Sequence, residues 1–199
     1  MLAPRLYACL LMCHALVACG RQSPKSDLAG TAQTRGTYLP VLPTDSLALS
    51  AVRFTQAFYD WYRTIDDADM VAVERRPDLF GTQLLSALRA DREAQHLCPG
   101  YICGLDWDPF TASQDPCDPY RAGRVLRHGD TTIVAVTHFG CTGSTVGRRP
   151  DVLAKLRQFD GRWQFVDFQD AWDSGGSSLL RQLDALAADR AAHWPSSRR

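Results

Sequence analysis

The dipeptide Asp160-Gly161 is the feature that most constrains the fold of this chain. It separates two runs of β-branched and aromatic residues. An Asp-Gly pair in that position strongly indicates a β-hairpin, because Asp and Gly tolerate the positive φ angles of the turn. A second tight turn is expected at His128-Gly129-Asp130. Four strand-like runs surround these turns: 124–127, 131–139, 152–159 and 162–168. Their spacing predicts an antiparallel meander.

Apolar residues at helical spacing predict helices on both sides of this sheet region. The first helix follows the capping residues 44–46, and its apolar face is formed by Phe54, Phe58, Trp61, Tyr62 and Ile65. A second helix follows Pro77-Asp78 after a short helical turn within 66–76, and Ser177 or Ser178 caps a final helix. This order indicates an α+β domain in which a curved sheet packs on the long N-terminal helix.

Four motifs carry a resemblance to a known family: Phe-Tyr-Asp-Trp-Tyr at 58–62, Asp-Pro-Phe-x-x-x-Gln-Asp at 108–115, Asp-Gly-Arg-Trp-Gln-Phe-Val-Asp-Phe at 160–168 and Gly-Gly-Ser-Ser-Leu-Leu at 175–180. Over roughly residues 50–190 the chain resembles a family of largely uncharacterised Gram-negative envelope proteins. The resemblance implies an NTF2-like, cystatin-type fold, with N-terminal helices on a curved antiparallel sheet and a C-terminal helix. It also implies an envelope location, but no reaction and no catalytic residue.

The N-terminus has the features of a secretion signal. A short basic start precedes an apolar stretch that is too short for a permanent membrane span. The stretch ends in Leu-Val-Ala-Cys, which resembles a bacterial lipobox and implies that Cys19 is acylated after residues 1–18 are removed. The alternative is an ordinary signal peptide. Residues 19–45 are then a lipidated cysteine with a flexible tether, and 46–199 form a single domain on the periplasmic face of the outer membrane.

Four cysteines follow the tether: Cys98, Cys103, Cys117 and Cys141. An even number in an oxidising compartment predicts two disulfides, for which three pairings exist. We favour Cys98–Cys103, which closes a Pro-Gly-Tyr-Ile loop, together with Cys117–Cys141. Because the chain has no Cys-x-x-Cys pair, no zinc site is expected. No other metal and no cofactor is predicted.

The acidic stretch 106–117 is the main candidate for a functional motif. Its first two carboxylates match an EF-hand loop, but the positions that require a further oxygen ligand, a Gly and a Glu hold other residues. A pair of carboxylates for glycoside cleavage is possible in any acidic segment and has no supporting motif. We therefore predict a structural crossover, in which Asp108 forms a turn and Trp107 and Phe110 enter the core. Gln114 and Asp115 are expected to accept hydrogen bonds from backbone N–H groups of this segment.

Few other residues suggest chemistry. No serine lies in a Gly-x-Ser-x-Gly context, and His138 falls in a strand, where a packed or half-exposed histidine is the usual case. The long loop that ends in Arg148 and Arg149 is a candidate contact for a partner. The 22 Lys and Arg residues balance 22 Asp and Glu residues, so no nucleic-acid binding is expected.

Two functions fit this sequence. The first is a non-catalytic lipoprotein that binds a protein partner; one specific form is an immunity protein that blocks a cell-wall hydrolase delivered by a rival bacterium. The second is a small-ligand-binding or enzymatic NTF2-like domain that uses the concave face of its sheet. The sequence favours the first, because it contains no constellation of catalytic residues.

Overall fold

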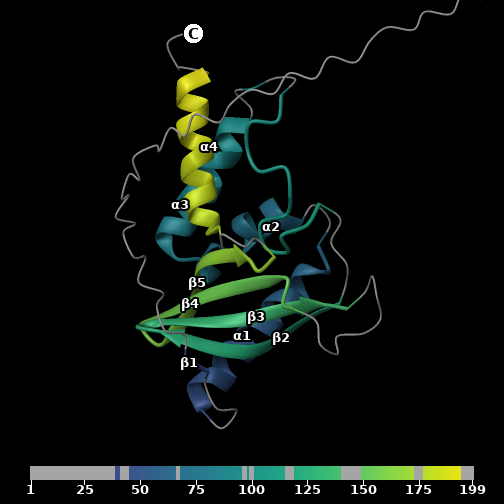
Figure 1. Ribbon diagram of the computed structural model, residues 1–199, viewed down its shortest axis with the longest axis vertical. Helices are drawn as coiled ribbons and strands as arrows, with labels where there is room; N and C mark the ends of the chain where they lie inside the picture. The colour runs from purple at the N-terminus through teal and green to yellow at the C-terminus, as the bar shows by residue number, and fades with distance from the viewer. Residues whose placement is uncertain are drawn as a thin grey trace, which may run out of the picture. The chain divides into compact units, whose positions relative to one another are not determined.

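The computed structural model describes residues 39–40, 45–65, 68–95, 98, 101–114, 119–139, 149–172 and 177–193. All of them belong to one compact unit, Gly36–Arg199. The elements, shown in Figure 1, are β1 (Leu39–Pro40), α1 (Ser46–Tyr62), α2 (Ala68–Arg75), the 3-10 turn η1 (Pro77–Leu79), α3 (Thr82–Gln95), β2 (Tyr120–His128), β3 (Thr131–His138), β4 (Val152–Phe159), β5 (Arg162–Asp170) and α4 (Leu179–His193). The predicted α+β class is confirmed. Among the described helices, none is both long and apolar enough to span a bilayer.

The sheet is an antiparallel meander in the order β1-β2-β3-β4-β5, in which β1 adds only two residues to four long strands. The turn between β4 and β5 has positive φ angles at both central residues, 49° at Asp160 and 74° at Gly161, as a type I′ hairpin turn requires. In the turn between β2 and β3, Gly129 has a φ of 60°. The predicted hairpins are therefore confirmed.

Strand β2 is longer than the run 124–127 on which its prediction rested. It begins at Tyr120, and its pairing with β3 shifts register between Ala122 and Val125. Such an irregularity interrupts the alternation of apolar and polar residues. The sequence pattern therefore indicated only the part of β2 that follows this register shift.

A second register shift, in β5, determines which side chains reach the core. Leu156 pairs with Phe165, but the preceding Lys155 pairs with Asp167, so Val166 is an extra residue. In a regular strand, residues three apart point to opposite faces. The bulge instead puts Phe165 and Phe168 on the same face, with ring centroids 4.9 Å apart. It also explains why alternation in this strand is weak.

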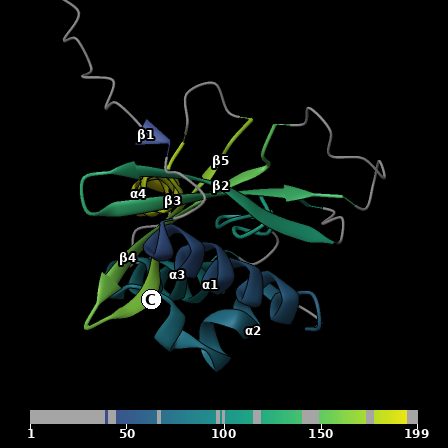
Figure 2. The same ribbon diagram turned by 90° about the horizontal axis from the view of Figure 1, so that it is seen from below.

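Helix α1 lies against one face of the sheet (Figure 2). The carboxylate of Asp45 caps its first turn by accepting from the backbone N–H groups of Leu47 and Ala48, at 2.8 and 3.2 Å. The helix ends at Tyr62, before the predicted Ile65. The indole Nε1 of Trp163 in β5 donates to Ser50 Oγ at 2.9 Å and thus attaches the sheet to α1.

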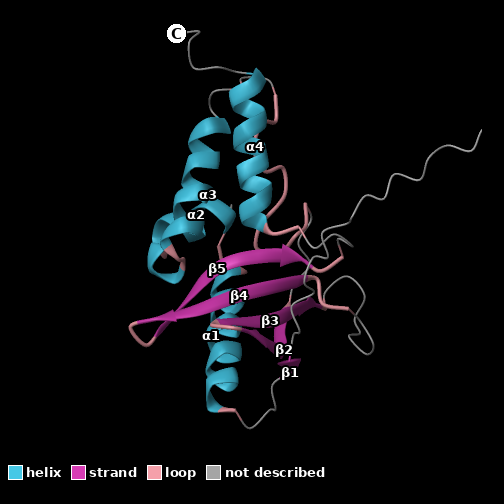
Figure 3. Cartoon of the chain, turned by 60° about the vertical axis from the view of Figure 1, so that its left-hand side comes forward, coloured by secondary structure: helices cyan, strands magenta, loops and turns pink. Residues whose placement is uncertain are grey.

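Helices α3 and α4 pack side by side next to β5 (Figure 3). The segment that precedes α3 pairs with the outer edge of this strand, and Gly81 donates its backbone N–H to the Phe165 carbonyl at 2.8 Å. This contact partly covers the edge, which limits pairing with other chains. The two helices thus extend the unit beyond its sheet.

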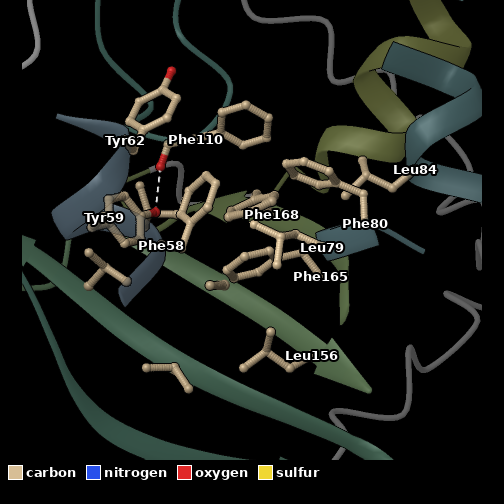
Figure 4. Packing of buried hydrophobic residues seen from close by; sticks show 14 of the residues in the cluster. Phe58, Tyr59, Tyr62, Leu79, Phe80, Leu84, Phe110, Leu156, Phe165 and Phe168 are labelled. Atoms are coloured by element: carbon tan, nitrogen blue, oxygen red, sulfur yellow. Dashed lines mark hydrogen bonds between the residues drawn. The ribbon is translucent and has the colours of Figure 1, made fainter. Parts of the chain in front are cut away.

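The core is an aromatic cluster centred on Phe110 (Figure 4). Phe110 is completely buried, and four aromatic rings lie with centroids 5.1–5.5 Å from its own: Phe58, Tyr62, Phe80 and Phe168. The hydroxyl of Tyr59 donates to the Phe110 carbonyl at 2.6 Å. Because Phe110 is on an irregular segment, this bond satisfies an acceptor that no strand or helix would satisfy.

Burial, reinforced first by the negative charge of Asp108 and then by Tyr120 and Asp151, raises the pKa of Tyr59 well above its ordinary value of 10.0. In the unfolded chain the Tyr59 phenol ionises at about pH 10, whereas in the folded chain it stays protonated to higher pH. The stability that this shift supplies is therefore fully present below pH ~10 and is lost as pH rises through the raised folded pKa.

We expect Tyr59→Phe to lower the free energy of unfolding by about 1–3 kcal/mol at neutral pH, because the Phe110 carbonyl loses its buried donor. Since phenylalanine cannot ionise, the difference between the two proteins should shrink above pH ~10. Urea unfolding from neutral pH to about pH 11 measures both effects. A difference that stays constant across this range would contradict the raised pKa.

Candidate functional site

The described part of the acidic stretch is a tight turn whose carboxylate is used internally. Asp108 Oδ1 accepts from the backbone N–H groups of Phe110 and Thr111, at 2.8 and 3.3 Å. Asp108 thereby holds Phe110 in position for the core. Gln114 is exposed and donates to the Asp106 carbonyl at 3.2 Å, so it acts as a surface donor and not as the expected acceptor for backbone N–H groups.

Several predicted site residues lie outside the described residues: Cys19, Asp115, Cys117, Cys141 and Arg148. The lipid site, the second disulfide and most of the candidate partner loop therefore stay predictions. Arg149 is described and exposed. The structure does not bring Arg149 together with the acidic turn in any described contact.

The Cys98–Cys103 disulfide is present, in agreement with the favoured pairing. Both cysteines are buried, whereas Tyr101 and Ile102 between them are 72% and 78% exposed. Two large apolar side chains on one short cross-linked loop are unusual for a surface and are typical of residues that become buried in an interface. We name residues 98–103 the disulfide loop.

A buried ion pair attaches the disulfide loop to α3 and α4. Arg190 of α4 donates to Asp91 of α3 and to the Cys103 carbonyl, the latter at 2.7 Å. The other oxygen of Asp91 accepts from the backbone N–H of Leu105 at 3.0 Å. Asp91 and Arg190 are only 3% and 9% exposed. Charged hydrogen bonds of this kind fix the loop end to both helices.

Gly104 makes this arrangement possible. A Cβ atom at Gly104 would lie 2.5 Å from the side chain of Gln95 and 2.8 Å from Asp91 Oδ2. Only a residue without a side chain allows the backbone to approach the Asp91 carboxylate so closely. The Cys103 end of the loop is therefore positioned by a disulfide, an ion pair and a close backbone contact.

The sequence did not lead us to predict the Asp91–Arg190 pair, although it contains one indication of it. Asp91 continues the buried stripe of α3 formed by Leu84 and Leu88, and Arg190 lies two helical turns after the buried Leu183 of α4. Opposite charges on the apolar stripes of two helices indicate a buried pair between them. The exposure of Tyr101 and Ile102 had no comparable indication, because apolar residues usually predict burial.

A second region is a pocket of about 560 Å³ on β4 and β5, which we name the β4–β5 pocket. Its polar residues Lys155 and Asp167 alternate with core residues, so the pocket opens on the sheet face opposite α1. These two residues form a 2.8 Å ion pair, and Arg157 pairs with Asp130 at 3.3 Å. The pocket thus has a suitable size for a small ligand, but its charges are already neutralised.

Among the described residues, no group of three or more His, Cys, Asp or Glu side chains is arranged to hold a metal ion. Comparison of the chain with protein-family models, with curated proteins and with solved structures found no match.

Proposed function

We propose that this protein is a lipid-anchored envelope protein that binds a protein partner through the disulfide loop and performs no reaction. The observation that carries this proposal is the exposure of Tyr101 and Ile102 on a loop whose ends are buried. Because the disulfide fixes both ends of the loop, its chain has less conformational entropy to lose on binding, so Tyr101 and Ile102 contribute more of their burial energy to affinity.

The remaining parts of the proposal rest on sequence. The lipobox at Cys19 supports an anchor on the periplasmic face of the outer membrane, and loss of the protein from membrane fractions in Cys19→Ser tests that anchor. An NTF2-like fold is supported by a long helix on an antiparallel meander. An immunity protein that blocks a cell-wall hydrolase is one specific form of such a binder, by analogy alone.

We expect Tyr101→Ser and Ile102→Ser to weaken partner binding by about 30-fold or more each, which corresponds to ~2 kcal/mol for residues that dominate an interface. Both side chains are exposed, so the midpoint of thermal unfolding should change little. A photo-crosslinking residue at position 102 in intact cells identifies the partner, and calorimetry with the purified pair measures the affinity.

Leu49→Gln is the matched control, because Leu49 is also an exposed apolar residue but lies in the first turn of α1. This variant should bind the partner as the wild type does. The proposal is wrong if no specific crosslink forms at position 102, or if loss of Tyr101 and Ile102 changes affinity no more than loss of Leu49.

The β4–β5 pocket supports a second candidate, the binding of a small ligand by the sheet. Its volume of about 560 Å³ lies within the usual range of ligand sites. Apolar Val166 and Leu180 line it together with the paired polar residues. We place this candidate second, because Lys155 and Asp167 in the pocket already pair with each other at 2.8 Å and so offer a ligand no free charge.

A further inference from the structure

The outer edge of β2 is a part of the sheet where another chain could pair. Among the described strands only β1 lies beside this edge, and β1 pairs with Leu126 and Arg127 alone. Residues 120–125 therefore have no strand on their outer side in the part of the chain that the structure describes. Such an edge presents backbone N–H and C=O groups that can bind an extended segment of another chain.

The side chain of Gln56 in α1 occupies this edge. Gln56 Nε2 donates to the Tyr120 carbonyl at 3.1 Å, and Gln56 Oε1 accepts from the backbone N–H of Ala122 at 2.9 Å. Alternate residues of a strand direct their backbone groups to the same side, so these are groups that a neighbouring strand would bind. A glutamine amide carries the donor and the acceptor of a peptide group. Gln56 thus replaces one residue of a further strand.

Asp60, one turn later in α1, fixes the orientation of this amide. Gln56 Nε2 also donates to Asp60 Oδ1 at 2.9 Å. Because a carboxylate only accepts hydrogen bonds, the amide nitrogen stays toward Asp60 and Tyr120, and the amide oxygen stays toward Ala122. The side chain is therefore held in the orientation that satisfies both backbone groups of β2.

Other features protect the rest of the edge. The register shift between Ala122 and Val125 makes the backbone irregular there, and the exposed Arg124 adds a positive charge. Two copies paired along β2 would bring their arginines near each other, and like charges on neighbouring strands repel. The regular stretch that remains is 120–122, and this is the stretch that Gln56 covers.

We infer that Gln56 prevents two copies of this chain from pairing through their β2 edges. A second copy is the expected occupant of an unprotected edge, because two identical strands in antiparallel orientation form a self-complementary contact. The amide of Gln56 already holds the Tyr120 carbonyl and the Ala122 N–H, so a second copy must displace it before a ladder can form. Neither proposed function depends on this role.

Hydrogen exchange of the full chain tests the contact itself. In Gln56→Ala the Ala122 amide should exchange about tenfold faster than in the wild type at low protein concentration, because it loses one hydrogen bond. Alanine is a good helix former, so α1 should stay folded. Gln164→Ala is the matched control and should leave this rate unchanged, because Gln164 also donates to a backbone carbonyl, that of Asp78, but lies on β5.

A photo-crosslinking residue at position 121 in intact cells tests the pairing. Arg124→Thr alone should give no crosslinked dimer, because Gln56 still covers the edge, whereas Gln56→Ala combined with Arg124→Thr should give one. The inference is overturned if the Ala122 amide exchanges equally fast in Gln56→Ala and in the wild type. It is also overturned if the double variant forms no more crosslinked dimer than Arg124→Thr does.

Discussion

Truncation of Phe110 to alanine is expected to reduce the free energy of unfolding by about 3–5 kcal/mol, the usual cost of removing a fully buried aromatic ring. Two terms add in this cost. The first is the free energy gained when the ring is transferred from water to the core, which the variant loses. The second is the cost of the cavity, because the four surrounding aromatic rings are too constrained by the sheet and α1 to fill it. For a domain of this size such a loss is a large fraction of total stability.

Denaturant unfolding followed by circular dichroism measures this effect. Phe159→Ala is the control, because Phe159 is 46% exposed at the end of β4 and its loss should cost much less. If Phe110→Ala were as stable as Phe159→Ala, the acidic stretch would not be a structural crossover. Its carboxylates would then have to be considered again as a functional site.

The second large effect is expected at Arg190. Arg190→Met should cost about 3–5 kcal/mol, because it leaves Asp91 as an unpaired buried charge. It also removes the donor to the Cys103 carbonyl. Since Arg190 holds the end of the disulfide loop, this variant should also weaken partner binding at temperatures where it remains folded.

Arg92→Met provides the comparison, since Arg92 forms an ion pair with Glu74 but both side chains are exposed. An exposed pair of this kind contributes about 0–1 kcal/mol. Thermal and urea unfolding of the two variants compares a buried with an exposed arginine on neighbouring helices. Equal stabilities for the two variants would show that the Arg190–Asp91 pair does not hold α3, α4 and the disulfide loop together.

The sequence by itself determined the elements whose formation depends on neighbouring residues. Asp160 and Gly161 predicted the hairpin because their local conformational preference matches the turn. The capping residues 44–46 predicted the start of α1 because a cap acts on the next three residues. The pairing of Cys98 with Cys103 was favoured because only four residues separate them. From these local features followed the order of helices and strands, and with it the α+β class.

Only the tertiary structure decided which polar groups meet. The Asp91–Arg190 pair joins residues 99 positions apart, and the bond from Trp163 to Ser50 joins the sheet to α1 across 113 positions. The bulge at Val166 likewise depends on pairing with β4. These contacts depend on packing between distant segments. Helical spacing places Asp91 and Arg190 on buried stripes, but which stripes meet is decided by the packing of α3 on α4, and the sequence pattern does not contain that information.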